Sequence, residues 1–209
     1  MMAHPSHPPP SRLPGPAPQP SRRAALQLAA AAAAAPLLLR AAPALAADKA
    51  PGGFVLVRDQ QDAYQFAYPF GWQEVQVEGQ DVVFKDVIEP LESVSVNMVP
   101  TDKADITEFG DVKEVTFTLA DKVLTSPRQE VNLVAASQRV VDGRPYYDFE
   151  FTARSGGAGG YTRHAAGSVT VANGKFYTLV TGSNEKRWGR MSGKVARVVQ
   201  SFTVSTRYD

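Results

Sequence analysis

Two-residue turns between alternating strands constrain the fold of this chain more than any other feature. Asn173 and Gly174 stand between two runs of β-type residues, and Asn-Gly is the strongest short signal for a hairpin. Asp142 and Gly143 form a second signal of the same kind. We therefore expect one hairpin with strands at residues 165–172 and 175–182, and another with strands at residues 131–141 and 144–151.

Shorter strands and two helices are expected around these hairpins. Tyr64, Phe66 and Tyr68 alternate with small or polar residues, which is the period of a strand. Apolar residues recur at helical spacing in residues 111–124 and from about 186 to 199. The predicted fold is α+β, a single domain in which an antiparallel β-sheet is flanked by helices. The other expected strands are residues 72–77, 82–85 and 94–98.

Each helix is expected to bury one apolar stripe against the sheet. The stripe of the first helix is Val112, Val115, Leu119 and Val123. The stripe of the second is Trp188, Met191, Val195, Val198 and Phe202. The large aromatic side chains expected in the core are Trp72, Phe149, Phe151 and Trp188.

Residues 1–46 are predicted to be a targeting segment. No Asp or Glu occurs before Asp48, as in organellar transit peptides. Arg22 and Arg23 precede an apolar run, and Ala44 and Ala46 are the small residues that a signal peptidase needs. The sequence therefore predicts a transit peptide plus a twin-arginine export signal at 1–46, then a domain at 47–209 with its core at about 54–204.

The charge of the predicted domain is unevenly distributed. Residues 47–209 contain 18 basic and 21 acidic residues, a net charge of −3. Residues 47–153 have a net charge of −10 and residues 154–209 a net charge of +7. Such asymmetry either orients the protein on a charged surface or reflects differently solvated regions. Nucleic acid is excluded as a partner by the negative net charge and the lack of a basic–aromatic motif.

Several stretches of the domain together form a recognisable pattern. The most specific is PTDKADITEFG at residues 100–110. The others are YQFAYPFGW at 64–72, VDGRPYY at 141–147, NGKFY at 173–177 and EKRW at 185–188. In this order and spacing they resemble the PsbP family of extrinsic photosystem II proteins over essentially the whole domain. Residues 68–74 and 85–94 are more similar to the PsbP-like branch than to PsbP itself.

The resemblance implies an extrinsic protein of the chloroplast thylakoid lumen, peripheral to the membrane, that docks on photosystem II subunits or assembly intermediates. The long N-terminal arm of PsbP is missing from the predicted mature chain, which favours a role in photosystem II assembly, repair or stability. A constitutive subunit of the oxygen-evolving complex is one alternative, and a lumenal module that binds a divalent metal is another. The expected mode of action is docking and not catalysis, and no cofactor is required.

His164 is the only histidine of the predicted domain. A two-residue turn at 173–174 pairs residue 172 with 175, so His164 faces Ser183 and Glu185 lies one diagonal step further. Imidazole and carboxylate suit a weak divalent metal site completed by water. The resemblance implies a divalent ion at the matching positions, calcium or manganese. The alternative is a pH-sensitive His–Glu ion pair or an ordinary surface contact.

The polar face of the second helix is the candidate docking surface. Its basic side chains are placed to contact acidic lumenal loops, as the resemblance implies, although an ordinary solvated helix face has the same pattern. The candidate docking residues are Lys186, Arg187, Arg190, Lys194 and Arg197.

Three other features are given structural interpretations. The acidic residues of the segment 81–92 lack the spacing of an EF-hand and are expected to lie in a solvated loop. Residues 155–160 are glycine-rich, but no Lys-Ser/Thr and helix follow, so a hairpin connection is expected. With no cysteine and one histidine, the domain has no signature of a catalytic triad, so no enzyme is predicted. The acidic residues of the segment 81–92 that are expected in the solvated loop are Asp81, Asp86, Glu89 and Glu92.

Overall fold

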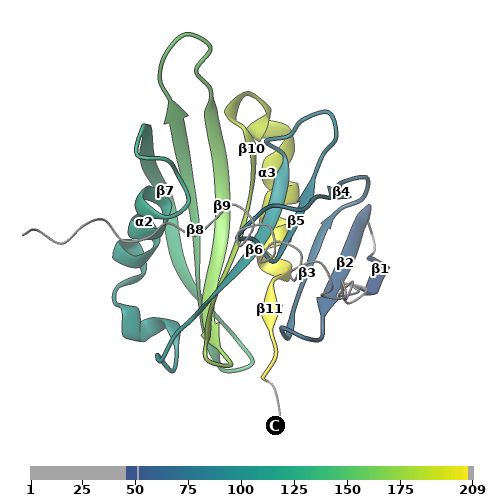
Figure 1. The fold of residues 1–209 in the computed structure, drawn as a ribbon, viewed down its shortest axis with the longest axis vertical. Helices are drawn as coiled ribbons and strands as arrows, with labels where there is room; N and C mark the ends of the chain where they lie inside the picture. The colour runs from purple at the N-terminus through teal and green to yellow at the C-terminus, as the bar shows by residue number, and fades with distance from the viewer. Residues whose placement is uncertain (1–45, 51, 207–209) are drawn as a thin grey trace, which may run out of the picture. The chain divides into compact units, whose positions relative to one another are not determined.

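The computed structural model describes residues 46–50 and 52–206. Seven strands form a large antiparallel sheet (Figure 1). Along the chain these are β4 (Gln73–Glu74), β5 (Val82–Lys85), β6 (Ser93–Pro100), β7 (Gln129–Val141), β8 (Arg144–Ser155), β9 (Thr162–Ala172) and β10 (Lys175–Asn184). Their order across the sheet is β4-β5-β6-β10-β9-β8-β7, so β10 joins the two hairpins to the shorter strands. The predicted α+β class is confirmed.

A second, smaller sheet was not predicted. Its strands are β1 (Ala46–Ala50), β2 (Phe54–Asp59), β3 (Tyr64–Pro69) and β11 (Thr203–Val204), in the order β1-β2-β3-β11. The strand predicted from the alternation at Tyr64, Phe66 and Tyr68 is therefore β3 of this small sheet. Of the targeting residues, Ala46 is the first residue of β1, and Arg22, Arg23 and Ala44 lie outside the described residues. The targeting role of residues 1–46 stays a prediction.

The turn signals fold as expected. Asn173 and Gly174 both have positive φ, 52° and 68°, as a primed turn requires. Asp142 and Gly143 have φ of 50° and 79°. The first turn pairs Lys175 with Ala172, and the predicted register between β9 and β10 continues to the end of the hairpin. The glycine-rich segment 155–160 joins β8 to β9, as predicted.

The strand predicted at residues 72–77 is shorter than expected, whereas the strand predicted at residues 82–85 is confirmed as β5. The stretch predicted at residues 72–77 is a strand only at β4, which pairs Gln73 with Lys85 and Glu74 with Phe84. One further backbone bond joins the Val75 nitrogen to the Val83 oxygen at 2.9 Å. Beyond it the chain turns, with the Gln80 nitrogen donating to the Val77 oxygen, so the ladder cannot continue.

Two α-helices and two short 3₁₀ helices complete the described fold. The 3₁₀ helix η1 (Ile106–Phe109) precedes α2 (Val112–Lys122), and η2 (Glu185–Arg187) precedes α3 (Trp188–Ser201). Asp111 caps α2 by accepting a hydrogen bond from the Lys113 nitrogen. None of the helices in residues 46–50 and 52–206 is both long enough and apolar enough to cross a membrane.

The predicted stripe of α2 is partly wrong. Val123 follows the end of the helix and is 67% exposed, because α2 stops at Lys122. The residues of α2 that the structure buries are Val115, Thr116 and Ala120. In α3 the predicted stripe is confirmed for Met191, Val195, Val198 and Phe202, while Trp188 is only partly buried.

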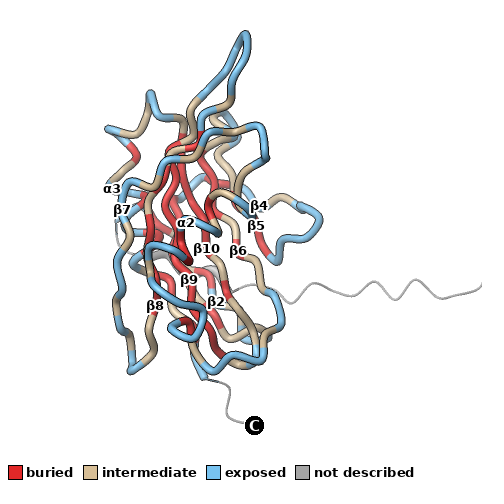
Figure 2. The backbone as a smooth tube through the Cα atoms, turned by 90° about the vertical axis from the view of Figure 1, so that its left-hand side faces the viewer, coloured by how far each residue is buried: buried red, intermediate tan, exposed pale blue. Residues whose placement is uncertain are grey.

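The large sheet has a hydrophobic cluster on each face. On one face, α3 packs against β9, β10 and the small-sheet strand β3, so this helix lies between the two sheets (Figure 1). Buried backbone runs along the strands of the sheet, whereas the loops at its ends are exposed (Figure 2). On the other face, α2 packs against β7 and β8. Alternate residues of one strand belong to different clusters; Tyr146, for example, faces α3 and Tyr147 faces α2. Trp72, Phe149 and Phe151 are buried, as predicted.

Gly182 provides a test of strand packing. An ideal Cβ at this position would lie 2.5 Å from the His164 oxygen and 2.9 Å from the Ala165 Cα, both of which are backbone atoms. We expect Gly182→Ala to lower the free energy of unfolding by about 1–3 kcal/mol, measured by urea denaturation. The control is Gly193→Ala in α3, where the Cβ meets open space and a gain of about 0.5–1 kcal/mol is expected. An unchanged stability of Gly182→Ala would contradict the described packing.

Candidate functional site

His164 lies at the centre of a polar cluster between the large sheet and α3. Its ring stacks on Trp188 with the centroids 3.6 Å apart and an interplanar angle of 5°. Its Nδ1 lies 2.6 Å from Glu185 Oε2, and its Nε2 lies 2.7 Å from Glu150 Oε1. His164 is buried, whereas both glutamates keep partial contact with solvent. The ring is therefore held by a carboxylate at each nitrogen.

The hairpin turn at residues 173–174 predicted the positions of His164 and Glu185. The third member of the cluster, Glu150, comes from another strand. The predicted pairing of His164 with Ser183 is confirmed, and Glu185 begins η2 directly after β10. Glu150 was not predicted as part of the site. It lies on β8, diagonally across from His164, because Thr152 is the residue that pairs with His164. The loop that joins β8 to β9 is too long to define a register from sequence, so no local signal could have identified Glu150.

The geometry favours an ion pair over a metal site. The two carboxylates contact opposite nitrogens of one ring, so they cannot converge on a single ion together with that ring. A metal at either nitrogen would have to displace the glutamate already bound there. Both nitrogens donate a hydrogen bond only in the imidazolium form, which matches two acceptors. Metal binding by His164 and Glu185 stays a prediction.

His164→Phe separates the two interpretations. The phenyl ring keeps the stacking on Trp188 but loses both hydrogen bonds, so we expect the free energy of unfolding to fall by about 1–3 kcal/mol. A double-mutant cycle with Glu185→Gln should show coupling between the two residues. Manganese and calcium are expected to leave the melting temperature of the wild type unchanged. A rise in that temperature that His164→Phe abolishes would instead support the metal site.

A second polar network lies next to the His164 cluster. Arg139 on β7 contacts Asp148 on β8, with Nε 2.7 Å from Oδ2, and the Ser168 hydroxyl donates to Asp148 Oδ1 at 2.6 Å. Arg139 Nη2 also donates to the Phe202 oxygen, at 2.8 Å, just beyond the end of α3. Burial raises the pKa of Asp148, although Ser168 and Arg139 oppose this. Ser168 thus bonds to a carboxylate and not to His164.

The five predicted docking residues do not form one uniform surface. Lys186, Arg190 and Lys194 are exposed, and no carboxylate of the described residues lies within ion-pair distance of them. Arg187 instead pairs with Glu89 at 3.1 Å and with Glu92. Arg197 lies over the Phe54 ring, 4.4 Å from its centroid. Arg197 is also exposed but is engaged with Phe54, so we call the other three exposed cations, Lys186, Arg190 and Lys194, the basic face.

The interpretation of the acidic segment as a solvated loop is wrong for Glu92. This residue is 4% exposed and accepts a hydrogen bond from Arg187. The loop around it is ordered by Asp86, whose side chain accepts hydrogen bonds from the nitrogens of Ile88 and Glu89. Arg187 therefore fixes the β5–β6 loop against the start of α3. The pairing joins residues far apart in the chain, so local charge pattern could not have predicted it.

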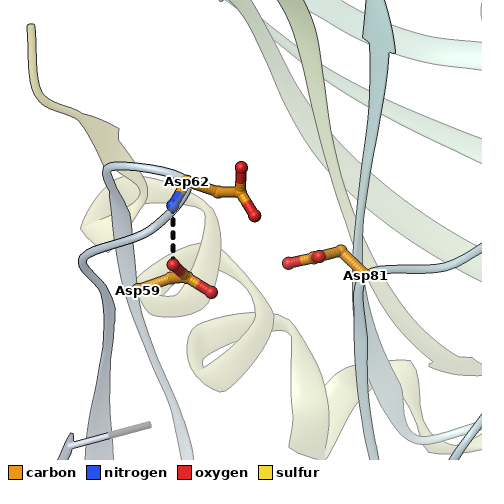
Figure 3. A group of neighbouring side chains, drawn as sticks. All are labelled: Asp59, Asp62 and Asp81. Carbon is orange, nitrogen blue, oxygen red and sulfur yellow. Dashed lines mark hydrogen bonds between the residues drawn. The ribbon is translucent and has the colours of Figure 1, made fainter. Parts of the chain in front are cut away.

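Three other carboxylates lie close together, those of Asp59, Asp62 and Asp81 (Figure 3). Their oxygens already have partners. Asp59 Oδ1 accepts from the Asp62 nitrogen at 2.7 Å, Asp62 Oδ1 lies 2.6 Å from Lys175 Nζ, and Asp81 accepts from the Tyr64 hydroxyl. Burial raises the pKa of Asp81, and Asp62 and Asp59 raise it further, although the Tyr64 hydrogen bond lowers it. The lysine and tyrosine thus satisfy two of the three carboxylates.

Asp81→Asn should change the pH dependence of stability. Because the pKa of Asp81 is raised in the folded state, the folded protein binds more protons than the unfolded chain, and stability falls as the pH rises through this pKa. The asparagine keeps an acceptor for Tyr64 and removes the charge. We expect Asp81→Asn to stabilise the protein at neutral pH and to have little effect near pH 3, as measured by urea denaturation. A destabilisation confined to neutral pH would contradict the raised pKa.

The fold defines a class of protein that combines a large antiparallel sheet, a small sheet and a helix between them. Comparison with known proteins finds that the PsbP family model matches residues 52–204. The chain is 55% identical over 168 residues to PsbP-like protein 1, chloroplastic, of Arabidopsis thaliana, covering 80% of this chain and 72% of that protein. The chain belongs to the PsbP family.

Other relatives agree with this family. The photosynthetic NDH subunit of lumenal location 1, chloroplastic, of Arabidopsis thaliana is 32% identical, and the alignment covers 77% of this chain and 66% of that protein. The solution structure of cyanobacterial PsbP (CyanoP) from Synechocystis sp. PCC 6803 is similar with a TM-score of 0.61 and 31% identity. That match covers 77% of this chain and 99% of the CyanoP chain. It shows that the two chains share one fold.

Proposed function

We propose that this protein is an extrinsic protein of the chloroplast thylakoid lumen that docks on photosystem II or its assembly intermediates. Docking supports the assembly, repair or stability of the photosystem, and no reaction is catalysed. The observation that carries the proposal is the basic face, three exposed cations on α3 and the short helix η2 that precedes it, with α3 held in place by the protein core. The relative with 55% identity is named a chloroplastic PsbP-like protein, which supports the compartment.

The basic face has the properties of a docking surface. Arg190 and Lys194 lie on the exposed side of α3, whose opposite side is buried, and Lys186 lies in η2 directly before it, so their positions are fixed before a partner arrives. Cations at the rim of an interface mainly accelerate association and choose among partners. Their effect is screened by salt, which gives the proposal a direct readout.

The second candidate partner is the photosynthetic NDH complex, because a relative with 32% identity is named as a lumenal subunit of it. The relative with the higher identity, PsbP-like protein 1, is not named for the NDH complex, so photosystem II stays the first candidate. A constitutive subunit of the oxygen-evolving complex remains an alternative for the same docking surface, and a divalent metal module, binding calcium or manganese, remains one for His164 and Glu185.

Charge reversal on the basic face tests docking. At low salt, Lys194→Glu should weaken binding about tenfold to thylakoid membranes from which the extrinsic proteins have been removed. The difference in affinity between the wild type and this variant should shrink as the salt concentration increases. The matched control is Lys113→Glu, the same change at an exposed position of α2. Binding is measured by co-sedimentation. Equal losses for the two variants would show that only total charge matters.

Native gels before and after strong light identify the partner. Co-migration of the wild type with photosystem II subcomplexes, lost in Lys194→Glu and kept in Lys113→Glu, is expected. Co-migration with the NDH complex alone would overturn the choice of photosystem II.

A further inference from the structure

A large groove lies on the face of the main sheet that is opposite to α3. It has a volume of about 880 Å³ and is bounded by α2 on one side and by the β4–β5 and β5–β6 loops on the other. The groove exists because α2 packs on β7 and β8 and leaves the same face of β6 and β10 uncovered. Its volume is within the range of small-molecule sites in proteins.

The two ends of the groove differ in chemistry. One end contains Arg163 and Ser93, whose Nη2 and Oγ atoms are 3.4 Å apart. The other end contains Val99, Phe109 and Phe176, and the last two rings meet edge to face at 5.1 Å. Ser93 and Val99 begin and nearly end β6, so the ends are separated by roughly 20 Å at about 3.3 Å per residue. The groove is therefore long, with a cationic end and an apolar end.

Arg163 is an incompletely paired cation. Its Nε atom is buried and has no hydrogen-bond partner, and no carboxylate within residues 46–50 and 52–206 pairs with its guanidinium. Burial lowers the pKa of this group. A buried charge without a partner is costly, and a bound anion would remove that cost. The carboxylate found in the described lining, Glu114, is in the first turn of α2, toward the apolar end.

The apolar end of the groove carries large hydrophobic side chains that are exposed to solvent. Val99 is 57% exposed and Phe109 43% exposed, and both line the groove. Large apolar side chains gathered on a concave surface are typical of a ligand site.

The floor of the groove does not suit a peptide. The strands β5, β6 and β10 each have a neighbouring strand on both sides, so their backbone groups are already paired in the sheet. A peptide on this face would leave its own backbone groups short of partners. A ligand with an apolar body and one charged group needs no such bonds.

We propose that this groove binds a single-chain amphiphile with an anionic head, a long-chain fatty acid. The carboxylate contacts Arg163 and Ser93, and the acyl chain lies along β6 toward Val99 and Phe109. The site is independent of the basic face, because α3 covers the opposite face of the sheet. It is therefore separate from docking on a photosystem.

Fluorescence titration of the full domain with cis-parinaric acid, a fluorescent fatty acid, tests this site. The wild type should bind the acid more tightly than its uncharged methyl ester. Arg163→Met, which keeps an apolar stem, should weaken acid binding at least about tenfold and leave ester binding nearly unchanged. Val99→Trp, at an exposed position, should weaken both ligands by filling the apolar end. Arg190→Met, on the other face, is the control and should change neither.

The outcomes separate the proposal from its rivals, provided that each variant keeps the melting temperature of a folded domain. Equal affinity of the wild type for acid and ester, or no binding of either, would overturn it. Binding of the acid by Arg163→Met with the affinity of the wild type would also overturn the proposal. If Arg163→Met instead lost binding to phosphatidylglycerol vesicles but not to free fatty acid, the ligand would be a membrane lipid and the proposal wrong.

Discussion

Helix α3 is packed between the large and small sheets, and most of the structure depends on that position. Met191, Val195 and Val198 bury its apolar side against both sheets. Polar contacts fix its two ends. At the start, Trp188 stacks on His164, and at the end, Arg139 donates to the Phe202 oxygen. Apolar burial supplies the free energy, and the polar contacts define the direction of the helix along the sheet.

The basic face follows from this arrangement. Because α3 is held at both ends, Arg190 and Lys194 on its outer side and Lys186 in the adjoining η2 are presented at fixed positions. Arg187 is diverted from that face to hold the β5–β6 loop through Glu89 and Glu92. One basic helix thus has two roles, since part of its charge is structural and part is available to a partner. A count of cations along the helix would not distinguish them.

Neighbouring residues of β9 belong to opposite faces of the sheet. His164 faces α3 and joins the polar cluster, whereas Arg163 faces the groove beside α2. The pleat of the strand separates them by a full sheet thickness, so a change at one position need not disturb the other. The proposed docking through the basic face and the proposed ligand binding in the groove can accordingly be tested separately by single substitutions.

The sequence by itself determined the hairpins, the contact of His164 with Ser183, and the buried stripe of α3. These follow from short-range rules, because an Asn-Gly turn restricts φ and therefore the register of the strands it joins. Only the tertiary structure decided that Glu150 completes the histidine cluster, that Glu92 is buried against Arg187, and that a second sheet covers α3. Each of these contacts joins segments whose separation along the chain leaves register and orientation open until the core is packed.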